Sequence, residues 1–159
     1  MLEVYEELEQ GSESWLEARR GLMSASELNL VLTPSMKIAN NEKTRAHAYE
    51  LAAQRLSGYT EPQWIGDNHL RGWADEIKAR DRYSAEIAPV REIGGMCKDF
   101  GAFKLWASPD GLIGDDEGLE VKSRVQKHHL ATVTSNEVPQ EHVLQVQANL
   151  LVSGRTVWN

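Results

Sequence analysis

The sequence of 159 residues contains a single cysteine, Cys97, so it can form neither an intrachain disulfide nor a metal site made of four cysteines. No apolar run approaches the roughly 18 residues needed to cross a bilayer. Residues 1–7 also lack the basic start and apolar centre of a secretory signal peptide. We therefore expect a protein of the cytoplasm, a reducing compartment, without membrane association.

An excess of basic residues is missing too. The formal net charge is -7, from 17 Lys and Arg against 24 Asp and Glu. This balance counts against a general nucleic-acid binder, which usually carries a basic footprint. It does not exclude a nuclease, because acidic metal ligands contribute to the negative sum and bound cations offset them locally. A small basic cleft on an acidic body can also bind DNA.

Helical patterns dominate the first half of the chain. A length of 159 residues with 41% hydrophobic side chains suits one domain with a single core. Capping residues and glycines predict four helices. Their expected ranges are Ser12–Arg20, Ser24 or Ser26 to just before Pro34, Asn41 to about Leu56, and about Asp67–Tyr83. The predicted inward face of the last helix consists of Leu70, Trp73, Ala74 and Ile77.

Short apolar runs replace this pattern near Ile87 and predict short strands with turns between them. The runs are Pro89-Val90, residues 103–106, Leu112-Ile113 and residues 119–121. A further helix is expected from Pro139 to Gly154, with an apolar stripe of Val143, Val146, Leu150 and Leu151. A strand-like run then begins where the sequence stops, so we expect a single domain over residues 1–159 that is truncated at its C-terminus.

Two carboxylates and a lysine are expected to meet on a hairpin. Residues 114–118 have the composition of a turn, and a hairpin centred there places Asp110 opposite Glu120. Because side chains alternate along a strand, Glu120 and Lys122 share one face. Asp-Gly pairs and Glu-x-Lys alternations are common on protein surfaces, so each feature alone says little. Together they place three charged groups at one spot.

Hydrolysis of a phosphodiester uses such a set of groups. Carboxylate oxygens are the ligands that Mg²⁺ prefers, and the metal activates water and stabilises charge on the attacking and leaving oxygens. A neighbouring lysine, here Lys122, can position that water or neutralise developing charge. The backbone carbonyl of Val121 lies between two polar side chains and is a candidate for a further ligand.

Residues 108–112 and 119–122, with Asp110, Glu120 and Lys122, resemble the active-site signature of the PD-(D/E)XK nucleases. More narrowly, they resemble the lambda exonuclease / YqaJ-like phage recombination nucleases. The other blocks that agree, in the same order along the chain, are residues 11–21, 24–27, 72–80, 145–147 and Gly154-Arg155. The resemblance implies an α/β (α+β) fold of the restriction-endonuclease-like type, a central mixed β-sheet flanked by helices.

The resemblance also implies roles for individual residues. Two Mg²⁺ ions, for which Mn²⁺ can substitute, would be held by Glu76, Asp110, Glu120 and the carbonyl of Val121. Gln145 would reach the catalytic Lys122, and its neighbour Gln147 would face away because two residues turn the helix by about 200°. The plain alternatives are an ion pair of Glu76 with Arg80 four residues on, and a surface position for Gln145.

Three further residues match those that hold a 5′-terminal phosphate in the family, namely Arg19, Ser26 and Ser108. The fork of an arginine binds phosphate through two hydrogen bonds, and Ser26 lies near the start of a predicted helix, which favours anions. The plain alternatives are a surface cation for Arg19, a helix cap for Ser26 and a hydroxyl at the end of a strand for Ser108.

The sequence therefore predicts a metal-dependent 5′→3′ exonuclease of double-stranded DNA that serves phage or prophage recombination in the bacterial cytoplasm. It would release 5′-mononucleotides and leave 3′ overhangs. By family resemblance it would form a ring-shaped trimer around DNA ends and work with a single-strand annealing protein. Two alternatives stay open: an endonuclease of the same superfamily, of the resolvase or restriction type, and a non-enzymatic DNA-binding module on the same scaffold. Cutting of closed circular duplex would favour the endonuclease.

The catalytic assignment predicts that Asp110→Ala abolishes nuclease activity, because the substitution removes an oxygen ligand of the metal. The measurement is digestion of 5′-phosphorylated linear duplex by the wild type and the variant. Unchanged activity in Asp110→Ala would favour the non-enzymatic module.

Overall fold

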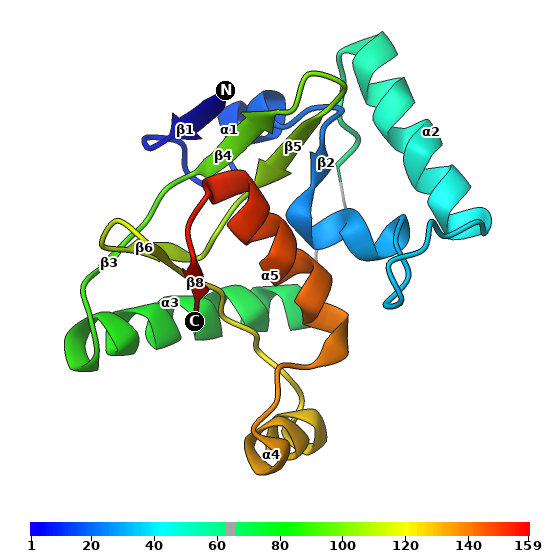
Figure 1. The fold of residues 1–159 in the computed structure, drawn as a ribbon. Coiled ribbons are helices and arrows are strands. Elements are labelled where there is room, and N and C mark those ends of the chain that lie inside the picture. The colour runs from blue at the N-terminus through cyan, green and yellow to red at the C-terminus, as the bar shows by residue number, and fades with distance from the viewer. Residues whose placement is uncertain (63–65) are drawn as a thin grey trace.

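Two four-stranded sheets with helices around them make up the computed structural model, which describes residues 1–62 and 66–159 (Figure 1). The first sheet has the order β1-β4-β5-β2, with β1 at Leu2–Tyr5, β2 at Met23–Ser24, β4 at Gly95–Asp99 and β5 at Lys104–Ala107. The second has the order β3-β6-β7-β8, with β3 at Val90–Arg91, β6 at Gly111–Ile113, β7 at Glu117–Leu119 and β8 at Val157–Trp158. Both sheets are mixed, because β2 runs parallel to β5 and β8 parallel to β7 while the other pairs are antiparallel.

The helices lie around these sheets. They are α1 (Glu13–Ala18), the 3-10 helix η1 (Ala25–Leu30), α2 (Glu42–Ser57), α3 (Asp67–Glu86), α4 (Gln126–Ser135) and α5 (Gln140–Ser153). Helix α5 packs against η1, β4 and β5, and Figure 1 shows it in front of the sheets with α4 projecting below. The predicted mixed α/β architecture is confirmed, although its strands are divided between two sheets. None of the helices in the described residues has the length and apolar character of a bilayer-spanning segment.

Local capping explains several helix boundaries. The side chain of Asn41 accepts a hydrogen bond from the backbone N–H of Thr44 at 3.0 Å and so caps the start of α2. Gly58 follows α2 in the left-handed region, with φ of 66°, a conformation that glycine adopts at little cost. Asn41 and Gly58 were both recognised in the sequence. The second predicted helix is the 3-10 helix η1, and strands β1 and β4 were not predicted.

The core lies between the first sheet and α5. Trp106 and Ala107 of β5 and Val152 of α5 have no exposed surface. The ring of Trp106 meets that of Trp15 edge to face, with centroids 6.5 Å apart, so α1 is anchored on the sheet. Burial of these large side chains fixes α1 and α5 relative to β5, the strand that leads into the predicted catalytic hairpin.

The predicted inward face of α3 is wrong, and that of α5 is right only in part, because Val143, Val146 and Leu150 are half-buried but Leu151 is exposed. In α3, Leu70, Trp73 and Ile77 are half exposed and Ala74 is exposed; the covered side consists of Gly72, Asp75, Glu76 and Arg80. In α5, the buried residues are Leu144, Ala148, Asn149 and Val152, while Leu151 is 52% exposed. Both helices direct polar side chains inward, toward the second sheet. A search for hydrophobic periodicity alone cannot identify such an inward face.

The orientation of α5 predicts unequal effects of two leucine substitutions. Leu144→Ala removes a buried side chain and should lower the free energy of unfolding by about 2–5 kcal/mol. Leu151→Ala changes an exposed side chain of the same helix and should cost within about 0.5 kcal/mol. Denaturant unfolding of both variants measures the difference, and a larger loss for Leu151→Ala would show that α5 is turned the other way.

Candidate nuclease active site

The hairpin of β6 and β7 has the register predicted from its turn. Gly111 pairs with Leu119 and Ile113 with Glu117, and the backbone N–H of Asp110 donates to the carbonyl of Leu119 at 3.1 Å. This register places Asp110 beside Glu120 at the open end of the hairpin. The backbone N–H of Glu120 donates to the carbonyl of Asn159 at 2.9 Å, so the residue after β7 is fixed by the chain end beyond β8.

The carboxylates of Asp110 and Glu120 are both buried. Asp110 is 9% exposed, and its Oδ2 accepts a hydrogen bond of 2.5 Å from the backbone N–H of Val121. The side chain of Glu120 is 6% exposed, and its Oε1 accepts from Nζ of Lys122 at 2.5 Å. The three groups that the sequence predicted to converge therefore do so.

Burial of the two acids raises the pKa of both. The pKa of Asp110 rises from 3.8 to about 8, first because its carboxyl is desolvated and then because of the charges of Glu120 and Glu76. Burial likewise raises the pKa of Glu120, against the opposing effect of Lys122. One partly exposed lysine thus faces a buried acidic pair. The site has a shortage of positive charge, which a divalent cation would correct.

Glu76 reaches the same site from α3. Its charge raises the pKa of both Asp110 and Glu120, although its Oε1 also accepts from Nη1 of Arg80 at 2.8 Å. The same Nη1 donates to the carbonyl of Asp110 at 3.3 Å. The ion pair between Glu76 and Arg80, four residues apart, was the plain alternative for Glu76. It exists, and it holds Glu76 beside the acidic pair rather than away from it.

The acidic side chains of this site are donors of the type that a hard divalent cation prefers. Among the described residues, no three Asp, Glu, His or Cys side chains are gathered closely enough to form a ready metal cage. The residues that could hold a cation are Asp110, Glu120 and Glu76, which all offer carboxylate oxygens of the type that Mg²⁺ prefers. The buried Oδ1 of Asn149, whose amide touches Glu120, has no hydrogen-bond partner within residues 1–62 and 66–159. An oxygen without a partner at this place is consistent with an ion or its water.

Helix α5 holds Glu120 through two side chains. Nε2 of Gln145 donates to Oε1 of Glu120 at 2.6 Å, and Nδ2 of Asn149 donates to Oε2 at 3.0 Å. The resemblance implied that Gln145 reaches Lys122, but the structure shows Gln145 bonded to Glu120 instead. Gln145 and Lys122 donate to the same oxygen, Oε1 of Glu120. Gln147 is exposed, as the helical angle predicted. Asn149 was missed, but its spacing of four residues from Gln145 places both on one helix face.

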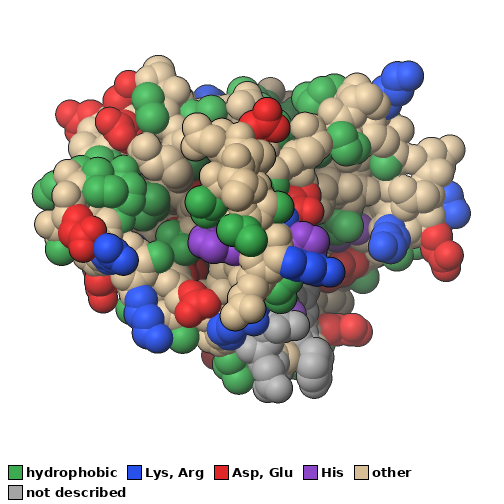
Figure 2. Space-filling model, turned by 90° about the horizontal axis from the view of Figure 1, so that it is seen from below, with side chains coloured by type: hydrophobic (Ala, Val, Ile, Leu, Met, Phe, Trp, Pro, Cys, Tyr) green, Lys and Arg blue, Asp and Glu red, His purple; other side chains and the backbone are tan. Residues whose placement is uncertain are grey.

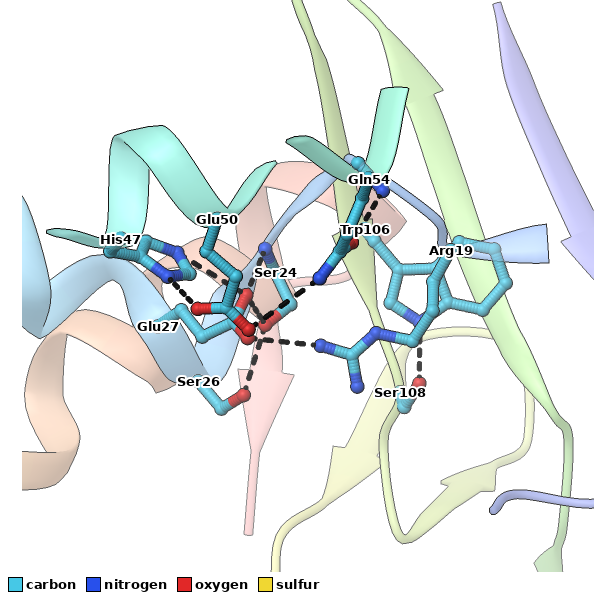
Figure 3. A network of polar contacts seen from close by, with 10 residues as sticks. Arg19, Ser24, Ser26, Glu27, His47, Glu50, Gln54, Trp106 and Ser108 are labelled. Atoms are coloured by element: carbon cyan, nitrogen blue, oxygen red, sulfur yellow. Dashed lines mark hydrogen bonds and ion pairs between the residues drawn. The ribbon is translucent and has the colours of Figure 1, made fainter. Parts of the chain in front are cut away.

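Arg19, Ser26 and Ser108 form a second cluster (Figure 3). The guanidinium of Arg19 lies 4.6 Å from the ring centre of Trp15. Ser108 donates to the carbonyl of Gly94 at 3.2 Å, and the exposed Ser26 lies on the other side of Arg19 in Figure 3. Burial lowers the pKa of Arg19, but an arginine stays charged at neutral pH. One cation flanked by two hydroxyl groups is a suitable arrangement for an anion.

A groove with several basic side chains begins at Lys122. A cavity of about 240 Å³ is lined by Lys122, Arg124, His128 and His142 together with Ser123, Val125 and Glu141. A second, more open hollow shares Arg124 and adds Arg71 and Lys127. Figure 2 shows the underside of the molecule, where blue and purple side chains gather near the middle of the face. The acidic chain therefore has a local basic surface beside the acidic pair.

Comparison with known proteins identifies similar sequences and structures. Residues 14–156 match the model of the YqaJ-like viral recombinase domain. A solved structure of an alkaline exonuclease from Laribacter hongkongensis is 30% identical, with a TM-score of 0.77 over 91% of this chain and 70% of that chain. The same exonuclease in complex with dAMP is 31% identical, with a TM-score of 0.76 over the same shares. A search of curated proteins gives no match. The fold is thus restriction-endonuclease-like, as the resemblance implied.

The raised pKa of Asp110 predicts a pH-dependent stability in the absence of divalent cations. The folded protein holds the Asp110 proton more tightly than the unfolded chain does, so the free energy of unfolding should fall as pH rises from 3.8 to about 8. Asp110→Asn removes this titration and should flatten the dependence. The measurement is denaturant unfolding in EDTA across this range.

Asp115→Asn is the matched control, because Asp115 is an exposed acid in the turn of the same hairpin. It should keep the pH dependence of the wild type. Equal slopes for the wild type and Asp110→Asn would contradict the assigned environment of Asp110.

Proposed function

Because the chain belongs to the YqaJ-like viral recombinase domain family, we propose that it is a metal-dependent exonuclease of double-stranded DNA. The observation that carries the proposal is the buried pair of Asp110 and Glu120 in contact with Lys122. Two buried acids with one lysine need further positive charge, and Mg²⁺ on oxygen ligands supplies it. In metal-dependent nucleases such a cation lies beside the phosphodiester, where it activates water and stabilises the charge of the leaving oxygen.

Each residue of this site has a proposed part. Asp110, Glu120 and Glu76, with the carbonyl of Val121, would hold two Mg²⁺ ions, for which Mn²⁺ can substitute. Lys122, 33% exposed, would neutralise charge that develops on the phosphate. Gln145 and Asn149 keep the carboxylate of Glu120 in one orientation, because they donate to its two different oxygens. A fixed carboxylate pre-organises the site before the substrate arrives.

The direction of degradation depends on the second cluster. Arg19, Ser26 and Ser108 would anchor a 5′-terminal phosphate, because a guanidinium and hydroxyl groups donate to phosphate oxygens. The hydroxyl of Ser108 would turn away from the carbonyl of Gly94 to do so. Ser108 lies two residues before Asp110, so the anchor and the catalytic hairpin are joined by one short segment. A 5′ anchor would make the enzyme remove nucleotides from DNA in the 5′→3′ direction. The products would be 5′-mononucleotides and a 3′ overhang.

Family membership supports further parts of the proposal. The alkaline exonuclease of Laribacter hongkongensis has been crystallised with dAMP, a nucleoside monophosphate of the kind proposed here as product. The groove that starts at Lys122 gives DNA a path on an otherwise acidic chain. A ring-shaped trimer, a single-strand annealing partner and a place in phage recombination in the bacterial cytoplasm stay predictions of the resemblance.

The proposal predicts that the protein digests 5′-phosphorylated linear duplex in Mg²⁺ and not in EDTA. Nucleoside 5′-monophosphates should accumulate from the start, because an end-bound enzyme removes one residue at a time. Chromatography of acid-soluble products and gel analysis of the remaining strand provide the measurement. Covalently closed circular duplex is the control and should stay intact. Cleavage of the circle would identify an endonuclease, and no cleavage of either substrate would contradict the proposed activity.

A further inference from the structure

Glu27 of η1 touches Arg19 of the proposed phosphate anchor and also Ser24, two residues before Ser26 (Figure 3). Its Oε1 accepts a hydrogen bond from Nη2 of Arg19 at 3.2 Å. Its Oε2 accepts from the hydroxyl of Ser24 at 2.6 Å and from the backbone N–H of Ser24 at 3.0 Å. The hydroxyl of Ser24 lies 3.1 Å from that of Ser26. One carboxylate therefore connects Arg19 with the segment that carries Ser26.

The guanidinium of Arg19 is restrained from two directions. Glu27 binds one of its nitrogens, and the ring of Trp15 supports it at 4.6 Å. Trp15 is itself fixed, because its Nε1 donates to the carbonyl of Gly94 at 2.7 Å. The hydroxyl of Ser108 donates to the same carbonyl. Trp15 thus places the guanidinium relative to Ser108, while Glu27 sets its orientation.

Helix α2 contacts Glu27 through the side chain of His47. His47 of α2 is 5% exposed, and its Nε2 lies 3.8 Å from Oε2 of Glu27. The other ring nitrogen, Nδ1, lies 3.2 Å from Glu50. Gln54 of α2 also accepts a hydrogen bond of 2.8 Å from the backbone N–H of Gly21, between Arg19 and Ser24. An element outside the phosphate site therefore contacts both Glu27 and the segment between Arg19 and Ser24.

A carboxylate at this place opposes phosphate binding by charge alone. At close range in a partly buried site, two negative groups repel each other appreciably. An acid at this place caps the start of η1, because its Oε2 accepts from the backbone N–H of Ser24. Its other oxygen binds Arg19, which gives it an orienting role as well. A long arginine side chain loses much rotamer freedom when it binds, and a partner that holds it beforehand reduces that cost.

We propose that Glu27 is a positioning residue that holds Arg19 and the Ser24–Ser26 segment ready for a 5′-terminal phosphate. This inference rests on the proposed function, since it assigns a role within the proposed anchor. Glu27 does not touch the phosphate; it acts through Arg19 and Ser24. Its removal should therefore lower the preference for phosphorylated ends and leave binding to the rest of the duplex unchanged.

The test compares binding of 5′-phosphorylated and 5′-hydroxyl duplex, measured by fluorescence anisotropy in EDTA so that no cleavage occurs. Glu27→Gln keeps an amide oxygen that can accept from Ser24 but turns an N–H₂ group toward Arg19. The preference for phosphate is the dissociation constant of the 5′-hydroxyl duplex divided by that of the 5′-phosphorylated duplex. This ratio should fall about tenfold, which corresponds to the loss of one charge-assisted hydrogen bond. Binding to the hydroxyl end should stay as in the wild type.

Glu17→Gln is the matched control, because the side chain of Glu17 pairs with the neighbouring Arg20 at 3.3 Å and not with the side chain of Arg19. It should keep the wild-type ratio. Charge repulsion alone predicts a higher ratio in Glu27→Gln, so an unchanged or higher ratio overturns the proposal. Should Glu27→Gln fail to fold, Glu27→Asp keeps the charge on a shorter side chain and should lower the ratio as well; an unchanged ratio there also overturns it. A wild type without preference for phosphate contradicts the proposed anchor itself, and the proposal for Glu27 with it.

Discussion

The close approach of two buried carboxylates is the constraint on which the rest of the site depends. Asp110 and Glu120 are desolvated together, and the charge of Glu76 adds to their repulsion. Such a pair is unfavourable unless hydrogen bonds and cations compensate for it. The backbone N–H of Val121 and the side chains on α5 supply the hydrogen bonds. The fold brings two acids together at an electrostatic cost, which the proposed cation would offset.

The sequence predicted the parts of the structure that depend on local rules. A turn over residues 114–118 fixes the register of its hairpin, because each residue along a strand alternates between faces. The hairpin register therefore predicts the relative positions of Asp110, Glu120 and Lys122, and the structure agrees. The helix caps at Asn41 and Gly58 were predictable for the same reason, since each acts on its own neighbours.

Parts that depend on distant partners were not predictable in this way. The hydrophobic pattern of α3 points to Leu70, Trp73 and Ile77, but the side chains facing the site are Glu76 and Arg80. The cost of turning a charged face inward is offset by the bonds made there, and these bonds involve residues far along the chain. Glu27 was recognised only as part of a block. Its link to Arg19 depends on how α1 and η1 pack, which composition does not reveal.

Helix α5 has two tasks on one surface. Leu144, Ala148 and Val152 fill the core, and Gln145 and Asn149 hold Glu120 from the same turns. A small rotation or shift of this helix would therefore loosen the interior and misplace the acid at the same time. Selection should therefore act on the buried positions of α5 in two ways, through the stability of the fold and through the rate of the reaction. Heat-sensitive alleles of such a gene would be expected to gather in this one segment.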